Sequence, residues 1–231
     1  MLLYQPQDGY CYNSDSLFLY DFINHFHPKG DVLDVGAGCG VLGLLIARDN
    51  PKIHLDAVEK QDIFIHYAST NARVNKINYT LHHMDFLDLP IEKKYDFIIS
   101  NPPFYPDKMQ KTNNEIISTA RYNNNLPLQS FFKKVSQLLK PQAHFIFCYD
   151  PTQLGMVCNA LEKAKLKIVD LQFVHPKVEK KASLVMIHTR NGSKSMMNIW
   201  PPFIAFEGDN PSKKAQEIYK KSSTQSIKCH I

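Results

Sequence analysis

The most constraining feature of this chain is a regular alternation of strand-like and helix-like segments between residues 31 and 189. Apolar runs that predict strands cover residues 31–36, 53–59, 79–85, 95–101, 143–149, 166–174 and 182–189. Segments with apolar residues at helical spacing separate them and predict helices over 40–49, 62–75, 128–139 and 152–164. This alternation is typical of an α/β domain with a mostly parallel sheet. We therefore predict a single doubly wound domain with seven strands, the last of which runs antiparallel at or near an edge.

Two further segments lie outside this alternation. Residues 14–26 are rich in bulky apolar side chains and predict a helix ahead of the sheet, while residues 212–221 predict a short basic helix near the end. Residues 105–125 form a long polar stretch with no clear period, which in a compact domain is typical of a functional or disordered loop. The domain is thus divided into a helical extension (1–30), a core (31–190) and a basic C-terminal segment (191–231).

Composition narrows the class of protein. The 231 residues are 44% hydrophobic, as expected for one globular domain with a full core. The first residues do not have the pattern of a signal peptide, and no apolar run is long enough to span a membrane. The five cysteines are scattered, with no Cys-x-x-Cys pair, and no histidine has a second ligand at metal spacing. We expect a cytoplasmic monomer with no metal and no membrane partner.

Positive charge is concentrated at the C-terminal end of the chain. Residues 1–176 contain 17 Lys/Arg against 18 Asp/Glu, whereas residues 177–231 contain 10 against 4. Such asymmetry is found in surfaces that bind nucleic-acid phosphates, and it is also found in solvated faces and tails. Charge alone leaves both interpretations open.

A glycine-rich turn follows the first predicted strand of the core. Residues 34–40 read Asp-Val-Gly-Ala-Gly-Cys-Gly, and four of the nine glycines fall between 36 and 43. Gly36, Gly38 and Gly40 allow a tight turn and let a ligand lie against bare backbone near a helix N-terminus. Glu59 ends the second strand, where a carboxylate can accept hydrogen bonds from both hydroxyls of a ribose. The pattern predicts a site for an adenosine-containing cofactor.

Two cofactors fit this pattern. Residues 38–43 also satisfy the dinucleotide fingerprint, which would indicate a nicotinamide enzyme. Asp34 favours S-adenosylmethionine instead, because an acid at that position is awkward beside a pyrophosphate and useful beside a cationic amino group. Asp85 and Phe86 suit an adenine pocket, the carboxylate for the exocyclic amine and the ring for the face. A helix N-cap or turn is an equally good explanation of Asp85.

Residues 101–104, Asn-Pro-Pro-Phe, end the apolar run 95–100 and indicate what kind of atom is attacked. An amino nitrogen conjugated to a ring or carbonyl is a poor nucleophile because its lone pair is delocalised. The Asn101 side-chain oxygen and the Pro102 carbonyl can accept its two N–H groups. Phe104 offers a flat face for a planar substrate. A strand followed by a proline-rich turn remains the alternative interpretation.

Taken together, these motifs resemble the class I S-adenosylmethionine-dependent methyltransferases. More narrowly, the chain looks like the bacterial tRNA1(Val) adenine-N6 methyltransferase family, within the small methyltransferase group. The resemblance covers nearly the whole chain: residues 9–19 look like the start of the opening helix, 34–40 and 59 like the cofactor motifs, 101–104 like the catalytic tetrapeptide, 120–122 like the segment that follows it, and 201–206 with 212–221 like the closing strand and helix. It implies a Rossmann-like methyltransferase sheet, and transfer of a methyl group to an adenine in tRNA next to the anticodon.

The resemblance also implies roles for individual residues. The catalytic set is Asn101, Pro102 and Phe104; the cofactor set is Asp15, Asp34, Gly36, Gly38, Gly40, Glu59, Asp85, Phe86 and Asn101; the RNA set is Pro103, Arg121, Lys213, Lys214, Lys220 and Lys221. The chain departs from the family at residue 104, where tyrosine is common, and at residue 39, where cysteine replaces serine or threonine. Residues 177–194 match only loosely, which leaves the RNA target the least constrained.

Other functions remain compatible with parts of the sequence. The tetrapeptide is shared with methyltransferases that act on glutamine amides, on guanine N2 and on DNA adenine. The glutamine enzymes usually carry a separate N-terminal helical domain, whereas only about 30 residues precede the first core strand here. A NAD(P)-dependent oxidoreductase would leave Asn101–Phe104 without a purpose. A catalytically silent scaffold that binds cofactor and RNA is disfavoured by the presence of Asn101.

Overall fold

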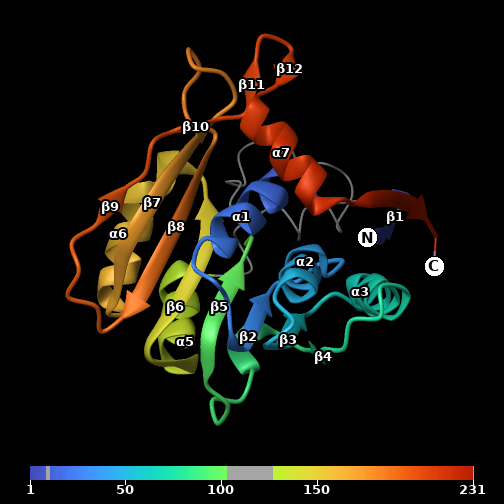
Figure 1. Ribbon diagram of the computed structural model, residues 1–231. Helices are drawn as coiled ribbons and strands as arrows, with labels where there is room; N and C mark the ends of the chain where they lie inside the picture. The colour runs from blue at the N-terminus through green and yellow to red at the C-terminus, as the bar shows by residue number, and fades with distance from the viewer. Residues whose placement is uncertain (9–10, 103–126, 231) are drawn as a thin grey trace.

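The computed structural model of the chain describes residues 1–8, 11–102 and 127–230. Its centre is a nine-stranded sheet in the order β10-β7-β8-β6-β5-β2-β3-β4, with β9 also paired to β7 (Figure 1). The strands are β2 (Gly30–Val35), β3 (Ile53–Glu59), β4 (Thr80–His83), β5 (Tyr95–Ser100), β6 (Leu139–Tyr149), β7 (Leu166–His175), β8 (Leu184–Asn191), β9 (Asn198–Ile199) and β10 (Phe203–Ile204).

The predicted α/β fold is confirmed. All pairings within this sheet are parallel except those of β8, which is antiparallel to both β6 and β7. The seven predicted strands are present. The antiparallel strand β8 lies between β6 and β7, so it is near the edge of the sheet and not at it. The two-residue strands β9 and β10, which add to β7, were not predicted, because segments this short have no readable periodicity.

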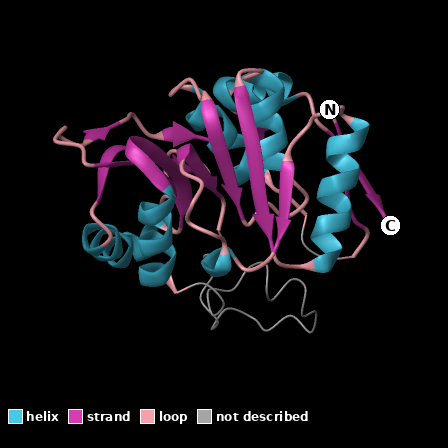
Figure 2. Ribbon diagram, turned by 90° about the horizontal axis from the view of Figure 1, so that it is seen from below, coloured by secondary structure: helices cyan, strands magenta, loops and turns pink. Residues whose placement is uncertain are grey.

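Helices cover both faces of the sheet (Figures 1 and 2). On one face lie α1 (Ser14–Asn24), α2 (Val41–Asp49), α3 (Asp62–Val74) and α7 (Lys213–Ser222); on the other lie α5 (Leu128–Leu138) and α6 (Leu154–Lys163). Short 3-10 turns, η1 (Phe86–Asp88) and η3 (Pro151–Gln153), follow β4 and β6. This arrangement is that of a doubly wound sheet, in which the carboxyl ends of the parallel strands share one edge.

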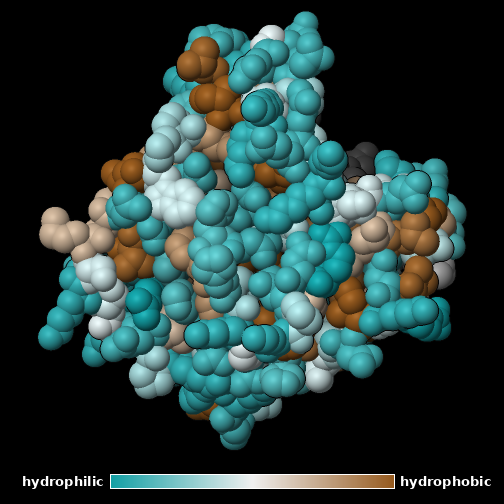
Figure 3. Space-filling view, viewed as in Figure 1, coloured by the Kyte–Doolittle hydropathy of each residue, from teal (hydrophilic) through white to brown (hydrophobic). Residues whose placement is uncertain are grey.

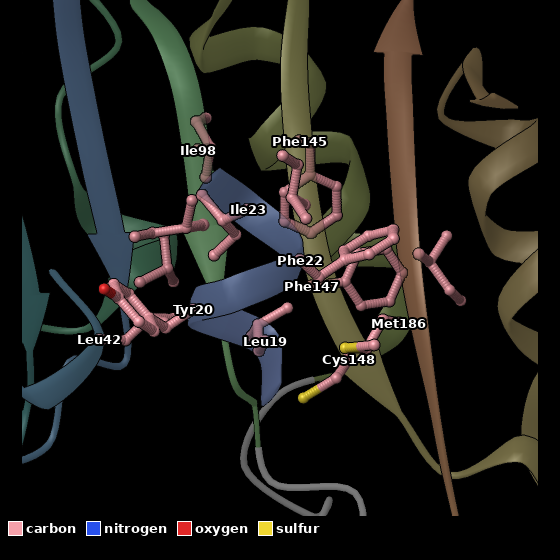
Figure 4. Packing of buried hydrophobic residues seen from close by; sticks show 14 of the residues in the cluster. Leu19, Tyr20, Phe22, Ile23, Leu42, Ile98, Phe145, Phe147, Cys148 and Met186 are labelled. Carbon is pink, nitrogen blue, oxygen red and sulfur yellow. The ribbon is translucent and has the colours of Figure 1, made fainter. Parts of the chain in front are cut away.

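The core lies between the sheet and these helices. Leu19, Phe22 and Ile23 of α1 are at most 1% exposed. They point toward Ile98, Phe145 and Phe147 on the sheet (Figure 4). Helix α1 therefore lies flat on the centre of the sheet, with its first turn close to the carboxyl edge. On the far face, α5 buries the side chains that its apolar spacing predicts: Phe131, Phe132, Val135 and Leu138.

The two ends of the chain form a second, two-stranded sheet that the sequence analysis did not predict. Strand β1 (Leu2–Pro6) pairs in parallel with β13 (Gln225–Cys229), so the extension before residue 30 contains a strand as well as a helix. A small hairpin joins β11 (Phe206–Glu207) to β12 (Asn210–Pro211) ahead of α7. Parallel pairing of segments more than 200 residues apart leaves no local signal in the sequence.

The face of the molecule seen in Figure 3 is mostly hydrophilic, with hydrophobic residues in small separate patches. Within the described part of the chain, no helix has the length and apolar character needed to cross a membrane.

Candidate active site

The glycine loop connects β2 to α2 at the carboxyl edge of the sheet. Gly36, Gly38 and Gly40 have φ angles of +69°, +54° and +79°, a region that strains residues with a side chain. A Cβ added at Gly36 or Gly38 would meet no atom within 4 Å, so these glycines are required by backbone conformation, and open space lies over the loop. The Gly36 N–H donates to the Val58 carbonyl at 2.9 Å and ties the loop to β3.

Asp34 is the penultimate residue of β2, next to this loop, and is 2% exposed. Its Oδ2 accepts a hydrogen bond from the Gly43 N–H at 2.9 Å, and a Cβ on residue 43 would lie 2.8 Å from that oxygen. Gly43 is therefore needed for close contact between α2 and the carboxylate. Burial raises the pKa of Asp34 to about 7, against the opposing effect of the Gly43 bond and with a contribution from Glu59. In residues 1–8, 11–102 and 127–230, no cationic side chain forms an ion pair with Asp34.

Glu59 ends β3 and is 6% exposed. Its Oε2 accepts from the Gly38 N–H at 2.9 Å, and its Oε1 accepts from the N–H groups of Lys60 and Gln61 at 2.8 and 2.9 Å. The carboxylate thus braces the glycine loop against β3. A carboxylate has about four lone-pair sites, so Glu59 retains capacity for a ligand hydroxyl.

Asp85 and Phe86 lie one strand further along the same edge. Asp85 caps η1, since its Oδ1 accepts from the Leu87 N–H at 3.0 Å, and its Oδ2 lies 3.8 Å from Lys60 Nζ. This is the N-cap geometry that the sequence left open as an alternative. Phe86 is 5% exposed and packs edge-on against Phe131 of α5. Their assignment to an adenine pocket stays a prediction.

Asn101 follows β5 on the other side of β2. Its Nδ2 donates to Ser16 Oγ at 3.0 Å, and its Oδ1 accepts from the Cys148 thiol at 3.0 Å. These two contacts orient the amide, with the oxygen on the side of β6 and the nitrogen on the side of α1. Burial raises the pKa of the Cys148 thiol, so this group stays protonated and donates. Pro102 is buried beside it, while Pro103, Phe104 and Arg121 lie outside the described residues.

A small cavity brings the glycine loop and Asn101 together. It is lined by Tyr12, Ser16, Asp34, Gly36, Ala37, Gly38, Cys39, Val41, Leu42 and Asn101. Asp15 lies in the first turn of α1 next to Ser16, where burial raises the pKa of its carboxyl and a hydrogen bond from Asn13 opposes this. The cavity therefore combines bare backbone, the Asp34 carboxylate and the oriented Asn101 amide. It suits a ligand that carries a cationic group.

The four lysines of α7 fall into two pairs. Lys214 and Lys221 both approach Asp21 of α1, with Nζ–O distances of 3.1 and 3.5 Å, and so help to dock α7 onto α1. Lys213 and Lys220 are exposed, and neither forms an ion pair with another described residue. Only the second pair is fully available to an external anion.

Several residues that line this site or support it were not identified from the sequence, among them Ser16, Cys148 and Tyr12. Ser16 and Cys148 hold the Asn101 amide, and Tyr12 lines the cavity. Cys148 lies inside an apolar strand and Ser16 inside an apolar helix, so neither has a local signal. Within the described ranges, no cluster of three or more His, Cys, Asp or Glu side chains could hold a metal ion.

Comparison with known proteins gives a family match over residues 13–126, to the model described as "Methyltransferase small domain". A tRNA1(Val) (adenine(37)-N6)-methyltransferase from Aliivibrio fischeri is 37% identical over 122 residues, which are 50% of each protein. An enzyme of the same name from Dyadobacter fermentans is 26% identical over 182 residues, covering 77% of this chain and 75% of the relative. The matched part of the chain spans about half the length of the first of these relatives.

Solved structures resemble the chain in fold. A predicted O-methyltransferase from Agrobacterium tumefaciens superposes with a TM-score of 0.72 over 93% of this chain and 100% of its own, at 12% identity. A 16S rRNA N2 methyltransferase from T. Thermophilus, in complex with AdoMet and guanosine, gives 0.56 over 78% of this chain and 44% of its own, at 20% identity.

Proposed function

We propose that this chain, which matches the methyltransferase small domain model over residues 13–126, transfers a methyl group from S-adenosylmethionine to the N6 amino group of an adenine in tRNA. The observation that carries the proposal is the Asn101 amide, held by Ser16 and Cys148 on the wall of the glycine-loop cavity. The relatives named for adenine 37 of tRNA1(Val) support this substrate and, by analogy, the adenosine next to the anticodon.

The residues around the cavity fit the cofactor. Gly36 and Gly38 leave open space over bare backbone, where the cofactor would otherwise meet side chains. Asp34 has no cationic partner within the described ranges and lies at the cavity wall, so it would pair with the cationic amino group. Glu59 would accept a hydrogen bond from a ribose hydroxyl through its remaining lone-pair site. Bound S-adenosylmethionine supplies an electrophilic methyl group on a sulfonium.

The acceptor side of the reaction is assigned to the end of β5. Asn101 Oδ1 has two lone pairs and uses one for the Cys148 thiol, so the other can accept one amino proton of the target base. The Pro102 carbonyl would accept the second. Holding both protons turns the nitrogen lone pair toward the methyl donor, and the methylated ammonium is acidic enough to need no strong base. Most of the acceleration would come from positioning and fixed dipoles. The base is flipped out of its stack to reach this pocket.

Two other acceptors use the same chemistry. Glutamine amides and guanine N2 also present planar amino groups, and one structural neighbour acts on 16S rRNA at N2. Both named relatives with sequence similarity act on tRNA adenine, which favours adenine here. All five cysteines are free thiols, which fits a reducing cytoplasm, where tRNA is modified.

The test is incubation with labelled S-adenosylmethionine and unmodified total tRNA, followed by nucleoside analysis. We expect N6-methyladenosine from the wild type and a loss of at least about 100-fold in rate from Asn101→Ala, because Asn101 supplies one of the two acceptors that position the nitrogen. Cofactor affinity should change little. Asn78→Ala, an exposed asparagine between α3 and β4, is the matched control. Methylated guanosine, or undiminished turnover by Asn101→Ala, would contradict the proposal.

A further inference from the structure

The two ends of the chain meet beside the glycine loop and form the two-stranded sheet β1–β13. The register runs from Leu2 opposite Gln225 to Pro6 opposite Cys229. Residues of β13 are mostly exposed, and a two-stranded sheet is marginal on its own. Its stability therefore depends on the side chains that hold it against the rest of the protein.

Two asparagines one turn apart, Asn71 in α3 and Asn75 at its C-cap, hold β1. Asn71 Oδ1 accepts from the Tyr4 N–H at 2.7 Å and Asn71 Nδ2 donates to the Tyr4 carbonyl at 3.0 Å; Asn75 makes the same pair of bonds to Leu2. The two amides thus bind β1 as a neighbouring strand would. Asn71 Nδ2 also donates to the Cys39 carbonyl at 2.9 Å, which links β1 directly to the glycine loop.

Tyr12 connects this terminal sheet to the cavity. Its backbone N–H donates to Gln5 Oε1 of β1 at 2.8 Å, and its hydroxyl donates to Thr224 Oγ1, just before β13, at 2.9 Å. Gln5 is 1% exposed and its Nε2 donates to Ser226 Oγ of β13 at 2.6 Å. The backbone of Tyr12 is therefore held by β1, and its hydroxyl is held by Thr224 just before β13. Tyr12 also lines the cavity.

We propose that Tyr12 is a cofactor-facing residue positioned by the paired chain ends, so that cofactor binding and the docking of β13 are energetically coupled. The inference rests on the proposed function, because it takes S-adenosylmethionine as the ligand of the cavity. Coupling between two sites is reciprocal: if docked β13 improves cofactor affinity by some factor, bound cofactor must favour docked β13 by the same factor. A tyrosine that merely packed would give no such reciprocity.

Two substitutions separate the ring from its tether. Thr224→Val keeps the shape of the side chain and removes the hydroxyl that holds Tyr12, and Tyr12→Phe removes the other partner of the same bond. Each should weaken S-adenosylmethionine binding, measured by calorimetry, by about fivefold, which corresponds to about 1 kcal/mol for one hydrogen bond. Thr80→Val, on an exposed threonine of the distant strand β4, is the matched control and should bind as the wild type.

Hydrogen exchange supplies the second measurement. In the wild type, saturating cofactor should slow exchange of the amides of residues 225–229 about fivefold, and this added protection should disappear in Thr224→Val. Weaker binding in both tether variants together with cofactor-dependent protection of β13 supports the proposal.

Other outcomes overturn it in distinguishable ways. Suppose that the wild type binds the cofactor. If both tether variants then bind it with wild-type affinity, or if the cofactor does not change hydrogen exchange in β13, the proposed coupling is wrong and the proposed function stands. If only Tyr12→Phe is weakened, the hydroxyl acts without the chain ends, and the coupling is again overturned. If the folded wild type does not bind S-adenosylmethionine, the proposed function and this inference fail together.

Discussion

Asp34 and Asp170 are both aspartates of the central sheet, yet the pKa of Asp34 is raised and that of Asp170 is lowered. Asp34, at the carboxyl edge, is desolvated and receives one backbone hydrogen bond from Gly43. Burial also disfavours the ionised form of Asp170 in β7, but hydrogen bonds from Trp200, His188 and Asn198 more than offset this effect and lower its pKa. The two environments therefore differ in how well they satisfy a negative charge.

The donors around Asp170 form a continuous network. Its Oδ1 accepts from Trp200 Nε1 at 2.9 Å, and its Oδ2 lies 2.8 Å from His188 Nδ1. Because a carboxylate only accepts, His188 Nδ1 carries the proton and its Nε2 accepts from His144 Nδ1 at 2.9 Å. The His144 ring stacks between His188 and Phe97. Asp170, His188, His144 and Trp200 satisfy one another's polar atoms, so we interpret this network as structural.

The contrast indicates which of the two carboxyl groups suits a bound cation. A buried carboxyl with a raised pKa and no cationic partner within the described ranges costs stability whenever it ionises, and a bound cation would remove that cost. Asp34 has this property and faces the cavity; Asp170 does not.

The largest expected effect is on cofactor binding by Asp34→Asn. Loss of a buried charge that pairs with the cofactor amino group should weaken S-adenosylmethionine affinity about 100-fold, or about 2.7 kcal/mol. Since Asp34 must ionise to form this pair, wild-type affinity should rise with pH through about 7, and Asp34→Asn should show a flat profile. Calorimetry between pH 6 and 8 measures both, and equal affinity of the two proteins would remove Asp34 from the site.

Asp34→Asn should weaken cofactor binding but increase the stability of the free protein above neutral pH. The folded-state pKa of Asp34, about 7, lies above the unfolded value of about 3.9, so the folded protein binds more protons between these pH values. The Asp34 contribution to the free energy of unfolding therefore falls as pH rises from about 4 to 7. Asp34→Asn lacks this loss and should be more stable than the wild type at pH 8 in urea unfolding. A less stable variant would mean that the charge is already compensated.

Asp170→Ala should lower the stability of the protein and leave cofactor binding unchanged. It leaves the buried His188 and the half-buried Trp200 without their acceptor, and we expect a loss of about 2 kcal/mol in the free energy of unfolding, because a buried donor without a partner is desolvated with no compensating hydrogen bond. Cofactor affinity should stay at the wild-type value. If the affinity fell as well, the two regions would be coupled and the division drawn above would be wrong.

Acidification should weaken the Asp170 region specifically. Burial lowers the pKa of His144 to about 4 and also lowers that of His188, whereas an unfolded histidine titrates near about 6.5. The unfolded chain therefore binds more protons between pH 6.5 and 4, and this contribution to stability is lost as pH falls through that window. His144→Phe keeps the stacked ring and should lose on the order of 1 kcal/mol less than the wild type between pH 7 and 4.5. Equal losses would mean that His144 is not the titrating group.

Sequence reasoning succeeded where the signal is local. The glycine loop, the acids at the ends of β2 and β3 and the alternation of strands and helices all follow from spacing within one or two elements. The pairing of β1 with β13 and the support of Asn101 by Cys148 depend on contacts between distant segments, which no local pattern encodes. Likewise the charge of α7 was visible, but its division into two pairs was not, because it depends on Asp21 in another helix.

That division gives the smallest effect and extends the comparison of satisfied with unsatisfied charge to cations. Lys213 and Lys220 are exposed without an ion pair among described residues, so replacing both with alanine should leave stability unchanged and reduce the salt dependence of tRNA binding, with a log–log slope smaller by about 1 to 2. Lys214 and Lys221 are about half exposed and pair with the buried Asp21, so their double replacement leaves that carboxylate unpaired and should cost at least about 1 kcal/mol of stability while changing the slope less. Binding measured at several salt concentrations, together with urea unfolding of the same proteins, separates the two pairs. Equal slopes for both double variants would show that the ion pairs with Asp21 open when RNA binds, and that charge satisfied within the free protein is no guide to the RNA surface.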